Sequence, residues 1–100
     1  MAFKFPLARY KVYGDSMIPT LKEGNEVICY RWAYSDKKPP KVDDIVVAKI
    51  KDLEIIKRVI FVRDEEVYLR GDNEHQSTDS RNFGWINIRQ IMGKAIWMLK

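Results

Sequence analysis

Alternation of apolar and polar residues, with clusters of Val and Ile, is the feature that most restricts what this chain can fold into. Successive side chains of a β-strand point to opposite faces, so a period of two residues predicts strands. No segment keeps the 3.6-residue period of an amphipathic helix, and the only helix we expect is about one turn after Ser16. We therefore expect a small, mostly antiparallel β fold, either a coiled sheet or a partly open barrel.

Strands are expected where this pattern is densest, at residues 10–13, 26–32, 44–50, 53–63, 66–70 and 86–98. A hairpin across Asp64 and Glu65 would join the fourth and fifth of these segments. Gly93 interrupts the last segment and predicts a bulge or a sharp bend there. Residues 35–41 contain two consecutive prolines and must form a loop, and residues 71–82 are polar and loop-like.

The length and composition bound the protein further. One hundred residues suit one domain, 1–100. Eighteen Lys and Arg against 14 Asp and Glu give a net charge of +4, which permits an acidic partner without requiring one. Cys29 is the single cysteine, so an internal disulfide and a multi-cysteine zinc site are excluded. No apolar run approaches the roughly 20 residues of a membrane span or the core of a secretory signal, and we expect a soluble, cytoplasmic protein.

The first candidate for chemistry is residues 14–20, Gly-Asp-Ser-Met-Ile-Pro-Thr. A serine placed two residues after a strand-ending glycine lies on a tight turn, where its hydroxyl can project into a groove beside free backbone N–H groups. Taken alone, Gly-Asp-Ser is also the composition of an ordinary turn.

The second candidate is Lys57, which shares a strand face with Ile55, Val59 and Phe61. Burial of an ammonium in such an apolar row lowers its pKa, and a neutral lysine can act as general base toward a serine hydroxyl. The alternative is a lysine that guards an edge strand, or one whose ammonium reaches out to solvent.

The third candidate is residues 71–84, a run of short hydrogen-bonding side chains around one arginine. Ser77 could orient an amine by accepting a hydrogen bond from it, while Asp79 and Arg81 could fix the loop through an ion pair. The alternative is a surface loop built of Asx and Ser turns.

The three segments together, in this order, resemble the serine–lysine peptidases of the signal peptidase I superfamily (S24/S26-like). That family carries Gly-Asp-Ser-Met-x-Pro-Thr, Lys-Arg-Val and Gly-Asp-Asn-x-x-x-Ser-x-Asp-Ser-Arg-x-x-Gly, and all three motifs are complete here. Within the superfamily the chain is most similar to the small nickel-type superoxide dismutase maturation proteases, through residues 30–32, 39–42 and 69–85. It departs from the family at Asn25, where Asp is usual, and at Asp43, where Gly is usual.

The resemblance implies the fold of the signal peptidase catalytic domain and a role for each matching residue. Ser16 would be the nucleophile, Lys57 the general base and Ser77 the group that orients Lys57. The backbone N–H of Ser16 would donate to the oxyanion. A side-chain donor that some members carry two residues before the nucleophile is missing, because that position is Gly14.

The resemblance also implies what such an enzyme would act on. It would remove an N-terminal leader from a precursor protein, plausibly nickel superoxide dismutase, or would process exported proteins as signal peptidase I does. Met17 and Ile45 would line shallow apolar pockets for small substrate side chains. Asp79 and Arg81 would support the loop. No cofactor or metal is implied for this chain.

Four other interpretations stay open on the residues. His75 could complete a Ser–His–Asp triad, and Cys29, His75, Asp72 and Asp79 could bind a metal, although their spacing carries no metal-site signal. A noncatalytic β module could bind single-stranded nucleic acid through residues 30–34 and the lysines that follow them. A self-cleaving repressor of the same fold is disfavoured, because the chain has no Ala-Gly bond to cut.

Overall fold

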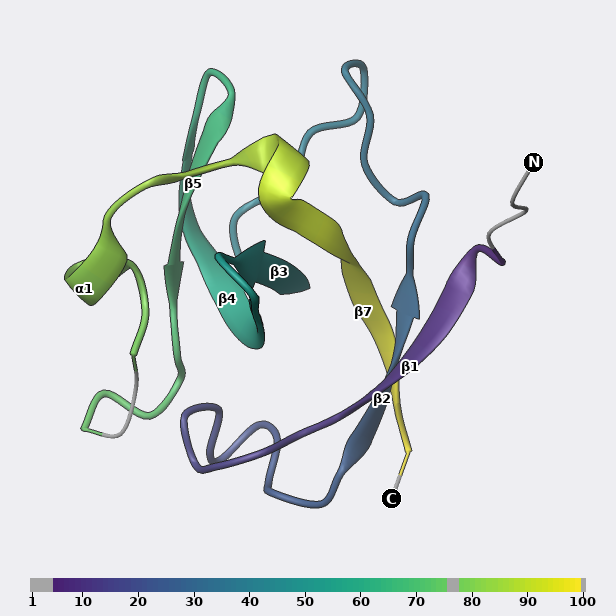
Figure 1. Ribbon diagram of the computed structural model, residues 1–100, viewed down its shortest axis with the longest axis vertical. Helices are drawn as coiled ribbons and strands as arrows, with labels where there is room; N and C mark the ends of the chain where they lie inside the picture. The colour runs from purple at the N-terminus through teal and green to yellow at the C-terminus, as the bar shows by residue number, and fades with distance from the viewer. Residues whose placement is uncertain (1–4, 76–77, 100) are drawn as a thin grey trace.

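The structure is a computed structural model, which describes residues 5–75 and 78–99 (Figure 1). Its strands are β1 (Leu7–Lys11), β2 (Glu26–Tyr30), β3 (Ile45–Ile50), β4 (Leu53–Arg63), β5 (Glu66–Arg70), β6 (Ile86–Asn87) and β7 (Ile91–Leu99). Two short helical segments accompany them, α1 (Ser80–Phe83) and the 3₁₀ turn η1 (Ile88–Gln90).

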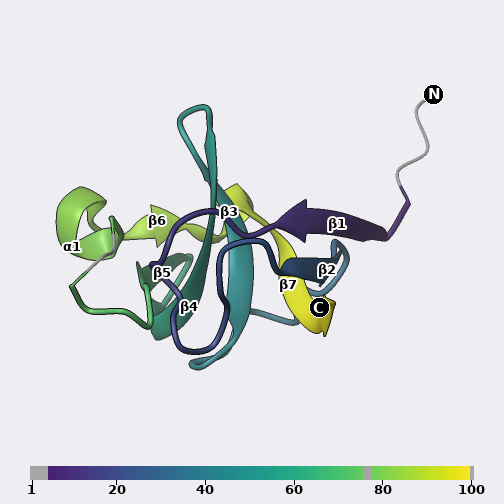
Figure 2. The same cartoon turned by 90° about the horizontal axis from the view of Figure 1, so that it is seen from below.

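The strands form one antiparallel sheet of seven strands in the order β1-β2-β7-β3-β4-β5-β6. In the described part of the chain β1 and β6 are the two edges and do not pair with each other, so the sheet is open rather than closed into a barrel. The sheet coils strongly, with β1, β2 and β7 on one side and β4, β5 and β6 on the other (Figures 1 and 2). The predicted fold class is confirmed, in its open form.

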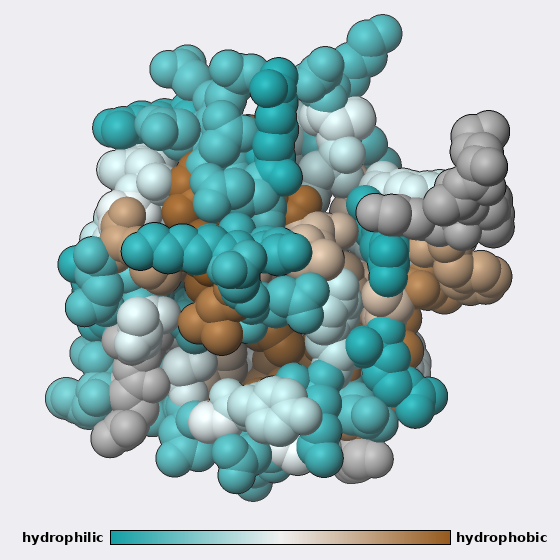
Figure 3. All heavy atoms as spheres, in the orientation of Figure 1, coloured by the Kyte–Doolittle hydropathy of each residue, from teal (hydrophilic) through white to brown (hydrophobic). Residues whose placement is uncertain are grey.

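Two clusters of buried apolar side chains fill the inside of the coil. One lies under β3, β4, β5 and β6 and comprises Val46, Ala48, Val59, Val67, Leu69 and Ile86. The other comprises Val12, Met17, Leu21 and Val27, and so lies directly under the turn that carries Ser16. Apolar side chains show through the middle of the face in Figure 3, within a rim of polar ones, as expected for a sheet that does not close.

The strand pairing leaves part of β4 open. The predicted hairpin is confirmed, with Arg63 opposite Glu66, but β5 ends where Arg70 lies opposite Arg58. β3 pairs with the first half of β4, from Leu53 to Arg58. Among the described residues, the edge of Leu53–Lys57 that faces away from β3 is therefore unpaired.

The irregularity predicted at Gly93 is confirmed. The register between β3 and β7 shifts between Val47 and Ala48, where β7 passes from Gly93 to Ile91. A Cβ atom at Gly93 would lie 2.6 Å from the carbonyl oxygen of Tyr30 and would collide with the sulfur of Cys29. The close approach of β2 and β7 thus requires a residue without a side chain.

Two local expectations need correction. The segment after Ser16 forms turns rather than a helix, closed by a hydrogen bond of 2.9 Å from the Leu21 N–H to the Met17 carbonyl. The loop expected at 71–82 is present at residues 71–75, 78 and 79, but residues 80–82 belong to α1, because the Asp79 side chain caps this helix and accepts from the Arg81 N–H. Within the described ranges, no helix is long and apolar enough to cross a membrane.

Candidate active site

Ser16 and Lys57 lie 41 residues apart in the sequence, and the fold brings them into contact. The Lys57 Nζ donates a hydrogen bond of 2.8 Å to the Ser16 Oγ. Lys57 lies on the buried face of β4 between Ile55 and Val59, as its position in the alternation predicts. Ser16 is held over the core by Met17, which is 1% exposed. Gly14, with φ +75°, begins the turn in a conformation that favours glycine.

The surroundings of Lys57 favour its neutral form. The side chain is 5% exposed. This burial lowers the pKa of Lys57 from its ordinary value, while the nearby carboxylate of Asp79 raises it in part. Because burial is the larger effect, the amine can lose its proton at a lower pH than a free lysine and accept one from a hydroxyl.

A groove of about 270 Å³ opens beside the two side chains. One wall is the extended segment from Lys11 to Tyr13, and the other is the unpaired half of β4. Ser16, Met17, Lys57 and Thr78 line it as well. The expectation for Ile45 was wrong, because that residue lines a separate hollow with Leu21 and Ala95. Ile45 precedes the part of β3 that pairs with β7. Its side chain packs against the buried cluster that contains Val27.

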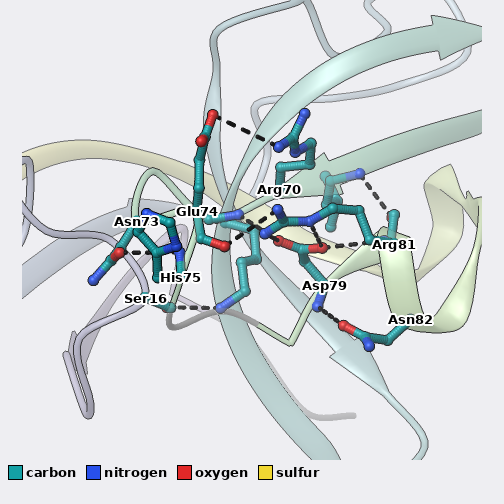
Figure 4. A network of polar contacts seen from close by, with 12 residues as sticks. Ser16, Arg70, Asn73, Glu74, His75, Asp79, Arg81 and Asn82 are labelled. Atoms are coloured by element: carbon teal, nitrogen blue, oxygen red, sulfur yellow. Dashed lines mark hydrogen bonds and ion pairs between the residues drawn. The ribbon is translucent and has the colours of Figure 1, made fainter.

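Asn73 ties the third motif to the serine turn. Its backbone N–H donates to the Ser16 carbonyl at 2.9 Å, and its side-chain amide donates to the Asp15 carbonyl at 3.0 Å. Its own side-chain oxygen accepts from the His75 N–H at 3.2 Å. Figure 4 shows Asn73 beside Ser16. Asn73 therefore holds the two peptide groups on either side of the Ser16 Cα.

A second link joins all three motifs through Asp72. The Arg58 guanidinium donates to both oxygens of Asp72, at 2.8 and 2.9 Å, and to the Asp43 carbonyl at 2.9 Å. The Thr20 hydroxyl also donates to Asp72. Hydrogen bonding from Arg58 is the main cause that lowers the pKa of Asp72. Our sequence reasoning gave no role to Arg58 or Asn73 and considered Asp72 only as a metal ligand, although each stands inside one of the three motifs.

Asp79 and Arg81 form the ion pair that their spacing allows. Asp79 is fully buried and accepts from Arg81 through Nε at 3.0 Å and Nη2 at 2.8 Å. Asp79 also accepts from the Gly71 N–H at 2.9 Å, and the Arg81 Nη1 donates to the Glu74 carbonyl at 3.4 Å. This network, drawn in Figure 4, closes the loop that follows β5.

The remaining candidates are placed as follows. Ser77 lies outside the described residues. His75 is exposed, and its backbone bonds to Asn73 rather than to the serine turn. Cys29 is fully buried, and burial raises the pKa of its thiol to about 11. Within residues 5–75 and 78–99 no group of three or more His, Cys, Asp or Glu is arranged to hold a metal ion.

Comparison with known proteins bears on this geometry. Residues 5–96 match the family model described as Peptidase S24-like. The chain belongs to the Peptidase S24-like family. The superfamily predicted from the three motifs is thereby confirmed.

Three relatives of this S24-like chain are proteases or peptidases by name. The mitochondrial ATP-independent inner membrane protease subunit 1b of Arabidopsis thaliana is 31% identical over 110 residues, which cover 85% of this chain and 65% of that protein. Signal peptidase I of Bacillus caldolyticus is 28% identical over 142 residues, 91% of this chain and 78% of that protein. The probable thylakoidal processing peptidase 2, chloroplastic, of Arabidopsis thaliana is 26% identical over 145 residues, 97% of this chain and 39% of that protein.

The chain thus spans just under two thirds of the Arabidopsis protease subunit and well under half of the thylakoidal peptidase. None of these three relatives is a nickel superoxide dismutase maturation protease, so that finer assignment stays a prediction.

Proposed function

We propose that this protein is a serine endopeptidase in which Ser16 is the nucleophile and Lys57 the general base. The observation that carries the proposal is the 2.8 Å hydrogen bond between the Lys57 Nζ and the Ser16 Oγ, made by a lysine whose pKa is lowered by burial. A hydroxyl held by a desolvated amine is an activated nucleophile. The family and the names of its relatives support the same reaction class.

The reaction follows from these two groups. Neutral Lys57 takes the proton of the Ser16 hydroxyl as Oγ bonds to the carbonyl carbon of a peptide, and the C=O electron pair moves onto the oxygen. The backbone N–H of Ser16 donates to this oxyanion. The C–N bond then breaks, and the leaving amine takes the proton from the Lys57 ammonium. Water attacks the resulting ester, with Lys57 again as base, which releases the acid and restores Ser16.

The substrate would bind as an extended strand. The unpaired edge of Leu53–Lys57 and the segment from Lys11 to Tyr13 face each other across the groove that holds Ser16. A peptide laid between them would satisfy the open backbone groups of β4, in the manner of a strand added to a sheet edge. The arrangement suits an unfolded leader or linker, because a folded segment cannot offer a free strand.

Replacing Ser16 with Ala tests the nucleophile. Ser16→Ala should reduce cleavage of a leader-bearing precursor by about 1,000-fold or more, with an unchanged thermal midpoint. Ser35→Ala, in an exposed turn, is the matched control and should cleave at the wild-type rate. Cleavage by Ser16→Ala at the rate of the control would refute the proposal.

For the substrate we favour a leader-bearing precursor such as that of nickel superoxide dismutase, on the strength of the motif resemblance. The protein would be mixed with that precursor and, separately, with a precursor of an exported protein. The new N-terminus of each product would be determined by mass spectrometry. Cleavage of the exported precursor but not of the superoxide dismutase precursor would assign the chain a signal peptidase I-type function.

The nucleic-acid module is less well supported. Stacking on bases requires exposed aromatic faces. The Tyr34 ring packs against the core and its hydroxyl donates to Asp44 at 2.7 Å, and Tyr30 is half-buried in β2. Trp32 is the exposed ring of the three, so residues 30–34 offer no continuous stacking surface.

A further inference from the structure

A second hollow, of about 420 Å³, lies between the loop that follows β2 and the middle of β7. Four lysines surround it: Lys37, Lys38 and Lys41 from the loop and Lys94 from β7. The loop rises at the upper end of the molecule in Figure 1, and that end is almost entirely polar in Figure 3. The hollow is separate from the groove that holds Ser16, with which it shares no residue.

The positive charge of this hollow is not neutralised from within. Asp44 is the one carboxylate among the described lining residues, and it is already engaged. It accepts from the Tyr34 hydroxyl at 2.7 Å and the Lys41 N–H at 3.0 Å, and it pairs with the Lys94 ammonium at 3.5 Å. The ammonium groups of Lys37, Lys38 and Lys41 have no carboxylate within 4.0 Å in the described part of the chain.

The acidic and basic side chains of the loop lie on two different sides. Asp36 lines a different hollow, together with Arg31, Asp64 and Glu65, and is not among the described residues that line the lysine hollow. The lysine side therefore carries a local excess of three positive charges, four lysines against Asp44. A negatively charged partner that binds on this side is attracted by the lysines, and the acidic residues on the other side of the loop do not cancel this attraction.

The floor of the hollow is apolar. Tyr30, Ala33 and Ile96 line it between the lysines, and Ile96 is 49% exposed. The walls are fixed before any partner arrives. Ser35 and Lys38 exchange two backbone hydrogen bonds of 3.0 Å, and Pro39 and Pro40 stiffen the segment that follows. A cationic rim around an apolar floor differs from a solvated run of lysines, because it offers a place for an apolar side chain as well.

We propose that this hollow docks an acidic peptide segment that carries at least one apolar side chain. Carboxylates of the segment would pair with the loop lysines, and the apolar side chain would cover Ile96. A nucleic acid fits less well, because the rings of Tyr30 and Tyr34 are not free to stack. The inference does not depend on Ser16 acting as nucleophile.

The position of the hollow makes such docking useful to a processing enzyme. Val46 of β3 lies between the two sites: it pairs with Lys94 of β7 on one side and with Lys57 of β4 on the other. Two strand spacings, about 10 Å, therefore separate the backbones of Lys94 and Lys57. A precursor with an acidic segment could be held here while its leader lies in the groove.

Fluorescence anisotropy on the Ser16→Ala protein tests the docking without cleavage. The probe is a fluorescein-labelled peptide of three Glu-Glu-Leu repeats. Lys37→Glu/Lys38→Glu should weaken binding at least tenfold, and Ile96→Ser should weaken it as well. The matched control, Lys22→Glu/Lys51→Glu, makes the same change in net charge at exposed sites away from the hollow and should alter binding less than twofold.

Each alternative has its own outcome. Equal weakening by both lysine pairs would show that only overall charge matters and would overturn the proposal. So would unchanged binding when Gln replaces every Glu of the peptide. Tighter binding of a nine-nucleotide oligothymidine than of the peptide, lost in Lys37→Glu/Lys38→Glu, would assign the hollow to nucleic acid instead.

Discussion

Asn73 holds the Ser16 turn through its backbone N–H, which donates to the Ser16 carbonyl, and its side-chain amide, which donates to the Asp15 carbonyl. Asn73→Ala keeps the first hydrogen bond and loses the second, so the turn should remain but sit less firmly. We expect a loss of kcat of about tenfold to 100-fold with little change in KM, because misplacement of a reacting group slows chemistry more than binding. Steady-state kinetics with a leader peptide measure this split.

Asn73→Asp sharpens the test. It removes the amide donor and places a carboxylate against the Asp15 carbonyl, so its kcat should fall below that of Asn73→Ala. Equal and wild-type activity in both variants would show that the side chain of Asn73 does not position Ser16.

The pH profile of cleavage reports on Lys57. Only the neutral amine accepts the hydroxyl proton, so activity should rise with pH through the pKa of Lys57, which burial places below its ordinary value of 10.5. Lys57→Arg should be inactive across this range, because a guanidinium keeps its proton. His75→Ala should leave the profile unchanged. A midpoint near 6.5 that disappears in His75→Ala would restore the triad.

Lys57 should cost the fold stability. Its pKa is lowered in the folded state, so the unfolded chain binds the proton more tightly, and folding is penalised at every pH below 10.5. The free energy of unfolding of the wild type should therefore rise as the pH increases from the folded-state pKa toward 10.5. Lys57→Met, which fills the same space without a charge, should be inactive yet more stable by about 1 kcal/mol at neutral pH. Urea denaturation at several pH values measures both, and a Met variant less stable than the wild type contradicts the argument.

Alanine substitutions at Ser77 and Ser80 should have different effects, the first on the rate of cleavage and the second on the stability of the fold. The Ser80 Oγ is buried and accepts from the Leu69 N–H at 2.8 Å, so Ser80→Ala leaves a buried donor without a partner and should cost about 1–3 kcal/mol of stability. Ser77 is proposed only to orient Lys57, so Ser77→Ala should lower kcat severely and leave the thermal midpoint unchanged. Calorimetry and kinetics on the two variants decide. Full turnover in Ser77→Ala would remove it from the mechanism.

The sequence predicts most of the strands and singles out Ser16 and Lys57 as candidates, because these signals are local. Lys57 stands out as a charge in an apolar row, and Ser16 stands on a turn between apolar segments. The contacts of Asp72 and Asn73 could not be predicted, because they join loops 52 and 58 residues apart and depend on how far the sheet coils. The coiling of the sheet also places Ile45 in a hollow separate from the groove that holds Ser16. Alternation places a side chain on a face but does not say what lies over that face.

The departure at Asp43, noticed in the sequence, has a structural counterpart. Asp43 adopts φ +81°, in the left-handed region that favours glycine. Its N–H donates to the Val59 carbonyl at 2.8 Å and its carbonyl accepts from Arg58 at 2.9 Å. These two hydrogen bonds hold the backbone of Asp43 in this conformation. A non-glycine residue pays about 1–2 kcal/mol in this region, and glycine loses about 0.5–1 kcal/mol through its freer unfolded state.

Asp43→Gly should therefore stabilise the protein by about 0.5–1 kcal/mol and keep its activity, because both backbone hydrogen bonds survive. Asp43→Ala is the control, since alanine keeps the Cβ and loses the polar side chain that helps Asp tolerate this conformation. Its free energy of unfolding should be lower than that of the wild type. Urea denaturation of the three proteins gives the order, and an alanine variant as stable as the glycine variant would mean that the backbone at Asp43 is not strained.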